Sequence, residues 1–422
     1  MISRATQTAA ADLPAAAIRD LMTPEAIRTR CGEILAIGLA GDLTWFDIDP
    51  TRLAETADRV VTEIRANYPT LDVPFHSRWR HFEFDGVDLW ANRAGQAGLS
   101  GPDLAVAAGD LAIVSVLLDA GAGPDWIYED ADTGLRLGRS EGLALASLRL
   151  FEAGSLSSTA NDPLRADADA LMALTPERLG EVFQVGPKNP LVGLEQRAGL
   201  LRKLGRAVAA RPDVFGAADA TRPGNTRPGN ILLWLKQQGN VQARDILLAL
   251  LDTLTGIWPS PVRIGDVPLG DVGRHPAISR ADASSGIVPF HKLSQWLSYS
   301  LIEPLQQSGT SVTALDGLTG LAEYRNGGLF IDTGVLSLKN AALSGQAHAP
   351  SSEPIVEWRA LTVALLDRIA VDVRAALGVD ADALPLASVL QGGTWSAGRQ
   401  IAAELRDGGG PPLIIQSDAT VF

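Results

Sequence analysis

Two neighbouring segments of the chain carry the side chains best suited to chemistry. In the first, residues 289–304, Lys292 and Gln295 are three positions apart and share one face of a predicted helix. The second, residues 315–332, contains Glu323. An ammonium, an amide and a carboxylate that face one cavity are able to bind a polar substrate and to transfer protons. The alternative is that Lys292 and Gln295 lie on an ordinary solvated helix face.

The segment 315–332 is predicted to be a loop, because glycines and charged residues interrupt two apolar helical runs. Glu323, Arg325 and Asp332 would then lie on loop backbone that rigid flanks aim inward. Loops often carry functional side chains, which favours a site here. The alternative is a long surface connection with solvated charges.

Apolar residues at helical spacing predict the elements that would hold this site. The predicted helices follow Asp49-Pro50 and Asn189-Pro190 and cover residues 53–68, 110–120, 190–208, 241–258, 289–304 and 353–377. Short strand signals occur at 126–129, 135–137 and 262–264. Strands do not alternate regularly with helices, so the fold class is mostly α: a multi-helical globule with a few short β-hairpins.

A cluster of cations and aromatic rings lies at residues 76–81. His76, Arg78 and Arg80 alternate with Trp79 in an otherwise acidic chain, and arginine suits bidentate capture of phosphate or carboxylate. The functional interpretation is a phosphate clamp, and the alternative is structural stacking at a helix junction. His76 and His81 share no face of a helix or strand, and the chain has no HExxH or CxxC motif. No metal site is therefore expected.

Two short motifs allow further interpretations. The glycine-rich segment 391–399 precedes a helical run and predicts either an anion site at a helix start or an ordinary cap. The segment 138–142 matches the Gly-x-Ser-x-Gly nucleophile elbow between a strand and a helix. Ser140 would be the nucleophile of a serine hydrolase, with His275, His291 or His348 as its base. The missing series of parallel-strand signals argues against that fold.

Composition limits the classes of protein and partner. The chain has 422 residues, of which 46% are apolar and 20% charged, as in a globular enzyme. A net charge of −13 disfavours nucleic acid as a partner. No uncharged apolar run reaches the ~20 residues of a membrane span. The single cysteine, Cys31, and the absence of a secretory signal pattern predict a cytoplasmic protein.

The predicted organisation is a flexible N-terminal tail at 1–20 and one helical catalytic unit at 21–422. Two subdomains meeting near 216–230 are the alternative. The pentapeptide Thr-Arg-Pro-Gly-Asn is duplicated there, at 221–225 and 226–230. Such a repeat is expected to be a tolerated insertion in a surface loop.

Five strings together resemble the uracil-catabolism family called Urc-four or Urg-three. They lie at 67–82, 117–123, 138–142, 288–296 and 323–328, and the likeness extends from about Leu21 to Phe422. This family is implicated in the route that converts uracil to its nucleotide and opens the ring, which leaves a ribosylurea-type product.

A weaker resemblance links the two opening segments to the queuosine-salvage N-glycosidases. Phe290–Gln295 and Leu318–Arg325 are similar in order and spacing to their Phe-Tyr-Lys-x-x-Gln helix and Ala-Asp-Tyr-Arg loop. Those proteins are all-helical and hydrolyse a base from ribose 5-phosphate. Glu323 stands where their pattern has Asp, so the carboxylate is retained one methylene further out.

The resemblances imply an N-ribosyl hydrolase that acts on ribosylurea or its 5-phosphate. Glu323, or Asp332 as the alternative, would stabilise the oxocarbenium-like transition state and orient water. The candidates for binding the leaving group are Lys292, Gln295 and Tyr324, and those for binding a phosphate are Arg78, Arg80 and Arg325. No metal or redox cofactor is implied. The second function class is a non-catalytic subunit that holds an intermediate for a pathway enzyme, and the serine hydrolase is third.

Overall fold

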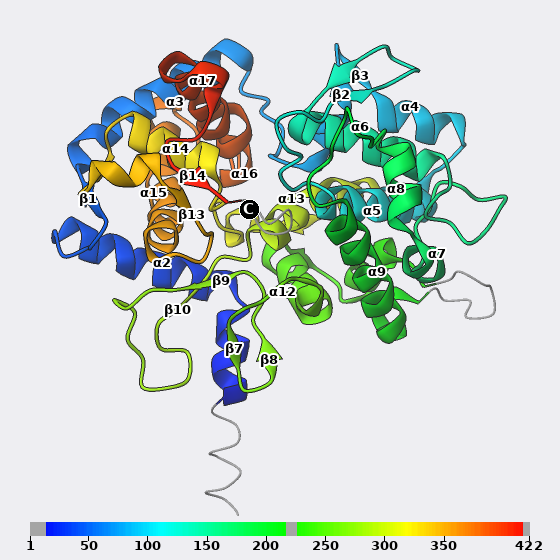
Figure 1. The fold of residues 1–422 in the computed structure, drawn as a ribbon, viewed down its shortest axis with the longest axis horizontal. Helices are drawn as coiled ribbons and strands as arrows, with labels where there is room; N and C mark the ends of the chain where they lie inside the picture. Colours follow the sequence, from blue (N-terminus) through cyan, green and yellow to red (C-terminus); the bar gives the residue numbers. More distant parts are fainter. Residues whose placement is uncertain (1–13, 217–225, 417–422) are drawn as a thin grey trace, which may run out of the picture. The chain divides into compact units, whose positions relative to one another are not determined.

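The computed structural model describes residues 14–216 and 226–416. Its architecture is mostly α, as the sequence predicts, and the strands are two or three residues long (Figure 1). Within the described residues every sheet has two strands. Two of them are the predicted hairpins, in which Tyr128 pairs with Leu137 and Ile264 pairs with Val267.

The chain forms two compact units, each assembled from separate stretches of sequence. Unit 1 contains Met1–His76, Ser260–Gln295 and Ala314–Gln416. Unit 2 contains Ser77–Pro259, Trp296–Thr313 and Ser417–Phe422. Residues 217–225 lie outside the described residues, and the subdomain boundary expected near 216–230 stays a prediction.

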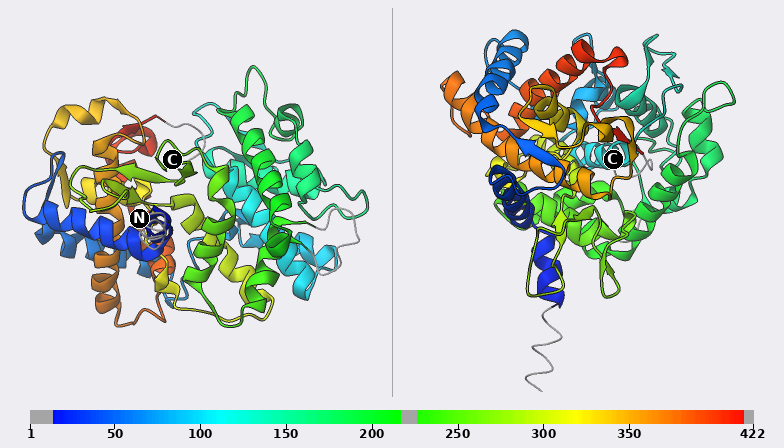
Figure 2. Two further views of the ribbon diagram at one scale, coloured as in Figure 1. Left: turned by 90° about the horizontal axis from the view of Figure 1, so that it is seen from below. Right: turned by 60° about the vertical axis from the view of Figure 1, so that its left-hand side comes forward.

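Unit 1 is built mainly from helices and short strand pairs, and its N-terminal and C-terminal stretches stay together in both views of Figure 2. Its helices are α2 (Pro24–Leu39), α3 (Leu53–Asn67), α14 (Tyr324–Asp332), α15 (Glu353–Leu377), α16 (Leu386–Val389) and α17 (Trp395–Leu405). Its strands are β1 (Phe46–Ile48), β7 (Arg263–Ile264), β8 (Val267–Pro268), β9 (Val272–Arg274), β10 (Ile287–Pro289), β12 (Leu336–Leu338), β13 (Ala347–His348) and β14 (Ile414–Ile415).

Unit 2 is a helical bundle with small hairpins. Its helices are α4 (Leu89–Gln96), α5 (Gly101–Leu117), α6 (Arg139–Glu152), α7 (Ala168–Ala173), α8 (Pro176–Val182), α9 (Leu194–Ala210), α10 (Pro212–Phe215), α11 (Ile231–Gln237) and α12 (Ala243–Leu254). Its strands are β2 (Glu83–Phe84), β3 (Val87–Asp88), β4 (Tyr128–Glu129), β5 (Arg136–Leu137), β6 (Val241–Gln242) and β11 (Val312–Thr313). Helix α13 (Lys292–Gln307) has its first turn in unit 1 and continues in unit 2.

The core of unit 1 forms around α15, the helix predicted at 353–377. Sixteen of its residues are buried, and it packs against α2, α3 and α14. The helix predicted after Asp49-Pro50 is confirmed: Asp49 accepts a hydrogen bond from the Thr51 amide at 3.0 Å, and α3 follows. Burial of apolar faces by these helices gives the site a rigid support.

The predicted tail divides into two parts. Residues 1–13 lie outside the described residues, whereas residues 14–21 are helical. Ala17 and Leu21 of this helix are buried in a cluster with Leu269 and Ile287. The helix is therefore part of the apolar core of unit 1.

The second copy of the duplicated pentapeptide is a structural anchor in unit 2. Arg227 donates from Nε to Asp110 Oδ2 at 2.8 Å, and the Gly229 amide donates to Asp110 Oδ1 at 2.7 Å. Asn230 donates from Nδ2 to the Phe215 carbonyl at 2.8 Å. Asp110 is fully buried, so these bonds compensate a carboxylate that is removed from water.

Gly229→Ala is expected to lower the free energy of unfolding by about 2–3 kcal/mol, through overpacking. A Cβ at Gly229 would lie 2.0 Å from the Val106 carbonyl oxygen. The matched control is Gly224→Ala, the same position in the first copy, which lies outside the described residues and is expected to be neutral. Urea unfolding of both variants measures the difference. Equal stability of the two variants would contradict the assigned anchor.

Candidate functional site

Glu323 caps the helix that follows it. Its backbone is extended, with φ −118° and ψ 144°, and its side chain turns back onto the first turn of α14. Oε1 accepts from the Arg325 amide at 2.9 Å, and Oε2 accepts from the Asn326 amide at 3.3 Å. These two bonds hold both carboxylate oxygens in place, and each oxygen keeps a further lone pair for a ligand.

The surroundings of Glu323 shift its ionisation. Burial raises the pKa of its carboxyl group above the ordinary range. The Arg325 and Asn326 amides and the positive charges of Lys292 and Arg325 oppose this rise. The result is a carboxyl group suited to proton transfer nearer neutral pH than a solvated glutamate.

Lys292 begins α13, and its charge acts on Glu323 within unit 1. The side chain is 9% exposed. The positive charge of Lys292 therefore reaches the Glu323 carboxyl group, and a cavity shared by the two residues stays a prediction. The alternative of a solvated helix face does not fit Lys292, because a solvated lysine would extend into water.

Gln295 links α13 to the segment that leads into Glu323. It is fully buried, and its Oε1 accepts from the Thr319 amide at 3.3 Å. Its Nε2 is buried and has no hydrogen-bond partner among the described residues. A buried donor without a partner is uncommon in native proteins and is consistent with a site that receives an acceptor from a ligand or water.

The loop predicted at 315–332 is wrong in its second half. Residues 324–332 form α14, so Arg325 and Asp332 are helical, and Glu323 is the cap. The glycines misled the prediction because they serve close helix packing. A Cβ at Gly327 would lie 2.6 Å from Thr362 Oγ1 and 2.8 Å from the Trp358 ring of α15.

Asp332 lies at the C-terminal end of α14 and pairs with Arg406. Its Oδ1 and Oδ2 accept from Nη1 and Nη2 of Arg406 at 2.7 and 2.6 Å. The Asp332 side chain is 4% exposed. This geometry is that of a bidentate structural ion pair.

Asp332→Asn is expected to lower stability by about 1–3 kcal/mol while leaving kcat within about twofold of wild type, because it removes a partly buried ion pair and no substrate contact. Thermal unfolding and steady-state kinetics below the unfolding transition measure the two effects. A large loss of kcat in a folded Asp332→Asn protein would make Asp332 the catalytic carboxylate.

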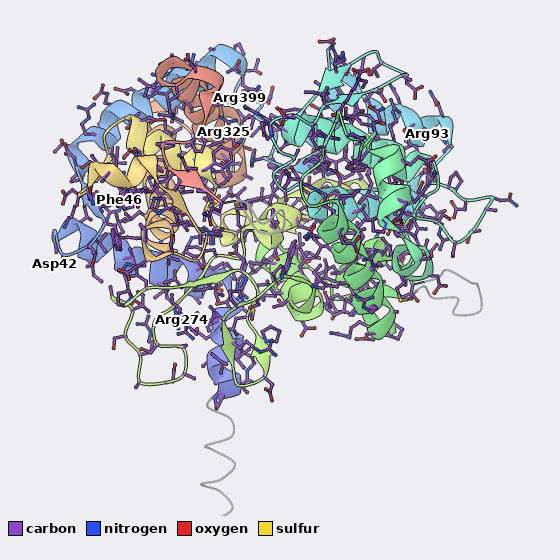
Figure 3. The ribbon with its side chains drawn as sticks, viewed as in Figure 1. Asp42, Phe46, Arg93, Arg274, Arg325 and Arg399 are labelled. Atoms are coloured by element: carbon purple, nitrogen blue, oxygen red, sulfur yellow. The ribbon has the colours of Figure 1, made fainter. Side chains whose placement is uncertain are left out.

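Tyr324 and Arg325 begin α14 beside the carboxylate. Arg325 is buried, donates from Nη1 to the Gly409 carbonyl at 3.0 Å, and lies 5.1 Å from the centre of the Tyr324 ring. A Cβ at Gly398 would come within 2.3 Å of the Arg325 carbonyl, which shows how closely α14 and α17 cross (Figure 3). The role of these residues in substrate binding stays a prediction.

The predicted phosphate-binding arginines belong to unit 2 and are paired within it. Arg78 is fully buried and donates from Nη1 to Asp119 at 2.7 Å. Arg80 donates from Nη2 to Glu303 at 2.7 Å. Trp79 is buried and donates from Nε1 to the Ser300 carbonyl at 2.7 Å. Because both guanidinium groups hold a carboxylate in this structure, phosphate would compete with these partners.

His76 is the last residue of its stretch in unit 1. It is buried, and its Nδ1 lies 2.9 Å from Gln391 Oε1. Burial lowers the pKa of His76 to about 4, so the imidazole is neutral at physiological pH. A neutral imidazole offers no charge to a phosphate. The substrate-binding role of His76 stays a prediction.

Helix α17 begins at Trp395, within the glycine-rich segment 391–399. Residues Leu390–Thr394 before it form a π-helical turn that joins α16 to α17, and Thr394 makes no side-chain capping bond, so the segment does not form the predicted capped helix start. Cβ atoms at Gly392 and Gly393 would lie 2.7 and 2.6 Å from Val73 and Val60. These glycines allow close packing against neighbouring backbone and side chains.

Ser140 lies at the start of α6, directly after β5, as the nucleophile-elbow motif predicts. The residue with a positive φ is Arg139, at 54°, which precedes Ser140 in the chain. Each of the three candidate histidines belongs to unit 1 and directs Nε2 to a protein acceptor: Glu357 for His275, Leu21 for His291 and Leu343 for His348. The described part of the chain has only two-stranded sheets, whereas an α/β-hydrolase mounts its serine on a larger sheet.

Across residues 14–216 and 226–416, no group of three or more His, Cys, Asp or Glu side chains has a geometry that could hold a metal ion. Of the helices in these same ranges, none combines the length and the apolar character needed to cross a membrane. The cytoplasmic location stays a prediction.

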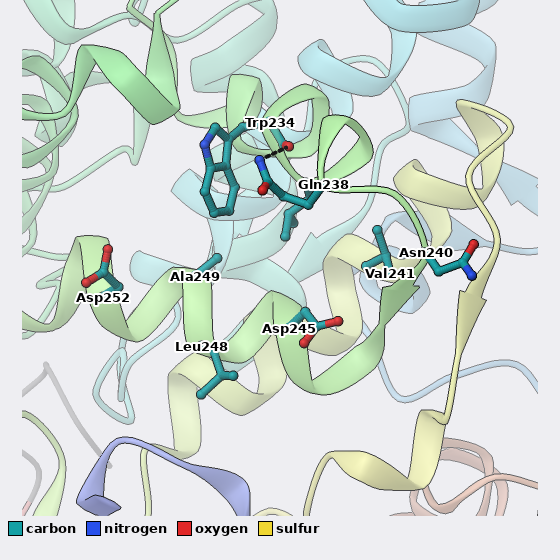
Figure 4. A pocket seen from close by; sticks show the side chains of 9 residues that line it. Trp234, Gln238, Asn240, Val241, Asp245, Leu248, Ala249 and Asp252 are labelled. Atoms are coloured by element: carbon teal, nitrogen blue, oxygen red, sulfur yellow. Dashed lines mark hydrogen bonds between the residues drawn. The ribbon is translucent and has the colours of Figure 1, made fainter. Parts of the chain in front are cut away.

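A surface hollow of 470 Å³ lies in unit 2 (Figure 4). It is formed by α11, β6 and α12 and is lined by Trp234, Leu235, Gln238, Asn240, Val241, Asp245, Leu248, Ala249 and Asp252. None of the sequence-predicted site residues is among these. Asp245 and Asp252 already accept hydrogen bonds from the Gln242 amide and from Arg211.

Three residues beside the site were missed by the sequence analysis. Asp271 accepts from the Lys292 amide at 2.9 Å, and Arg359 pairs with Asp271. Asn326 is fully buried, donates its amide to Glu323, and has no partner for its Nδ2 among the described residues. Asp271 and Arg359 carry no sequence signal, because their relation to Lys292 depends on tertiary contacts. Asn326 follows Glu323 by three residues and is recognisable only once Glu323 is known to be a cap.

Fold and site together define a mostly α protein with a helix-capping glutamate beside a buried lysine. The chain belongs to the protein family described as "Protein of unknown function (DUF1688)", whose model matches residues 20–422. It is 39% identical over 415 residues to Protein urg3 of Schizosaccharomyces pombe, covering 96% of this chain and 99% of that protein. It is 36% identical over 417 residues to Uracil catabolism protein 4 of Lachancea kluyveri, covering 89% and 92%. The resemblance to the Urc-four/Urg-three family is thus confirmed.

Proposed function

We propose that this chain acts in uracil catabolism by hydrolysing the N-ribosyl bond of ribosylurea or of its 5-phosphate. The name of its relative, Uracil catabolism protein 4, supports the pathway. The observation that supports the reaction is that Glu323 caps α14 in unit 1, where the positive charge of Lys292 lowers the pKa of its carboxyl group. A fixed carboxylate and a nearby ammonium match the two needs of this bond cleavage.

The reaction consumes water and yields urea and the free sugar. The bond from the anomeric carbon to the urea nitrogen breaks, and its electron pair leaves with the nitrogen. Positive charge develops on the sugar, and the Glu323 carboxylate stabilises it electrostatically. Glu323 then accepts a proton from the attacking water, whose oxygen becomes the anomeric hydroxyl.

The urea leaving group needs hydrogen-bond donors and a proton on its departing nitrogen. Lys292 donates the proton that the departing nitrogen needs, and the proton that Glu323 takes from water restores the ammonium group. Gln295 supplies a buried Nε2 without a partner among the described residues. Both groups suit the carbonyl oxygen of urea, which gains negative charge as the bond breaks. Tyr324 begins the same helix that Glu323 caps and is the further donor.

The arginines proposed for phosphate binding already have hydrogen-bond partners in the protein. Arg78, Arg80 and Arg325 each hold an acceptor within their own unit. Phosphorylated and unphosphorylated substrates must therefore be compared directly. A preference for the phosphate is expected to fall in the double variant Arg78→Ala/Arg80→Ala.

The test is incubation of purified protein with synthetic ribosylurea and ribosylurea 5-phosphate, with uridine as a control substrate. Release of urea from either ribosylurea supports the proposal. Ligand-induced thermal stabilisation without any urea indicates the alternative, an intermediate-binding subunit that serves a pathway enzyme. If the protein shows neither thermal stabilisation nor urea release, both the hydrolase and the intermediate-binding subunit are excluded.

A further inference from the structure

The turn before Lys292 is held by one buried residue, Asp271, through its carboxylate and its backbone carbonyl. Asp271 Oδ2 accepts from the Lys292 amide at 2.9 Å, at the first residue of α13. The Asp271 carbonyl also accepts from the Phe290 and His291 amides, at 3.1 and 3.0 Å. Three successive amides of the turn therefore converge on a single residue.

Asp271 is itself fixed by Arg359 of α15. Nη1 and Nη2 of Arg359 donate to Oδ1 and Oδ2 at 2.9 and 2.8 Å, and both side chains are buried. The Arg359 guanidinium lies 4.1 Å from the centre of the Phe290 ring. A bidentate pair stacked on an aromatic ring fixes both the position and the plane of the carboxylate.

The turn is also strained. His291 has a φ of +46°, in the left-handed region, and its Nε2 lies 3.0 Å from the Leu21 carbonyl oxygen. Such a conformation is unfavourable in a residue with a side chain and persists only where the surrounding contacts hold it. The hydrogen bonds to Asp271 and its ion pair with Arg359 hold the backbone in this conformation.

We propose that Asp271, held by Arg359, is a positioning residue that sets the place of the Lys292 ammonium beside Glu323. This inference rests on the proposed function for its catalytic meaning. The positioning of Lys292 by Asp271 does not depend on the identity of the substrate. A misplaced Lys292 would weaken both its interaction with Glu323 and its contact with the leaving group.

The direction of the change in the Glu323 pKa distinguishes displacement of Lys292 from simple loss of the Asp271 charge. Two cations lower the pKa of Glu323, Lys292 on α13 and Arg325 on α14. Removing the negative charge of Asp271 would not, by itself, raise the pKa of Glu323, because the loss of an anion favours the ionised form of a carboxyl group. Displacement of Lys292 has the opposite effect and raises it. A rise in Asp271→Asn therefore reports movement of Lys292.

The experiment follows the Glu323 carboxyl by ¹³C NMR titration, assigned by its absence in Glu323→Gln, in wild type, Asp271→Asn, Arg359→Lys and Lys292→Met. We expect Asp271→Asn to raise the Glu323 pKa at least half as much as Lys292→Met does, and Arg359→Lys to raise it less. The control is Asp130→Asn in unit 2, which breaks a similar bidentate pair with Arg149. It is expected to leave the Glu323 pKa unchanged.

Activity provides the second readout. Asp271→Asn is expected to lower kcat for urea release by about 10- to 100-fold, with its acid limb displaced to higher pH, whereas Asp130→Asn keeps the wild-type profile. A Glu323 pKa that is unchanged or lowered in Asp271→Asn, while Lys292→Met raises it, would overturn the positioning role. If Asp271→Asn does not fold, Arg359→Lys is the test: a raised Glu323 pKa in this variant supports the positioning role, and an unchanged or lowered pKa overturns it. A wild-type protein that releases no urea, with the expected pKa changes intact, would remove the proposed function alone.

Discussion

Glu323→Gln is expected to lower kcat for urea release by about 10³-fold, because a neutral amide cannot stabilise the charge that develops on the sugar. KM is expected to change little, since the amide keeps the size of the carboxyl group and most ground-state contacts. Steady-state urea release, measured at the pH optimum of the wild-type protein, gives both constants.

The stability of Glu323→Gln distinguishes loss of catalysis from loss of fold. The folded-state pKa of Glu323 is raised, so the folded protein binds the proton more tightly than the unfolded chain. Ionised Glu323 therefore lowers stability as pH rises from its unfolded pKa through its folded pKa. Glutamine removes this penalty but loses one capping bond worth about 1 kcal/mol. We expect little net change in Tm at neutral pH, and a folded Glu323→Gln protein with wild-type kcat would exclude the assigned role.

Lys292→Met is expected to lower kcat/KM by about 10²-fold and to shift the acid limb of the pH–rate profile to higher pH. The first effect follows from loss of a donor to the leaving group. The second follows because the Lys292 charge lowers the pKa of Glu323, so its removal raises that pKa. Activity that requires ionised Glu323 then begins at a higher pH.

The pH–rate profile of Lys292→Met should be compared with those of Lys292→Arg and Lys203→Met. Lys292→Arg keeps the charge and should retain the position of the acid limb even where kcat falls. Lys203 is exposed on α9 of unit 2, and its replacement should leave the profile unchanged. An acid limb that is the same in Lys292→Met and wild type would show that Lys292 does not act on the catalytic carboxyl.

Sequence periodicity predicted the helices whose apolar faces are continuous. Helix α15 begins and ends where the pattern at 353–377 does, and α3 follows its Asp49-Pro50 signal. The same logic failed at α14, because Gly327 and Gly328 were interpreted as loop residues. Their lack of a side chain allows α14 to approach Trp358 and its neighbours, and this close approach is a tertiary property that composition does not reveal.

The centre of the site was more predictable than its support. Lys292 and Glu323 were chosen for their chemistry, and the positive charge of Lys292 lowers the pKa of Glu323 in the folded chain. Asp271 and Arg359 are distant in the sequence from Glu323 and from each other, and only the folded chain joins them. Arg78 and Arg80 show the converse: their composition suits phosphate, but within unit 2 they hold Asp119 and Glu303.

Urea release from ribosylurea labelled with ¹³C at the urea carbon tests the central claim most directly. Wild-type protein is predicted to yield intact [¹³C]urea and free sugar in equal amounts by NMR, and Glu323→Gln is predicted to leave the substrate unchanged over the same time. Label recovered as bicarbonate, or equal turnover by Glu323→Gln, would contradict cleavage of the N-ribosyl bond by Glu323.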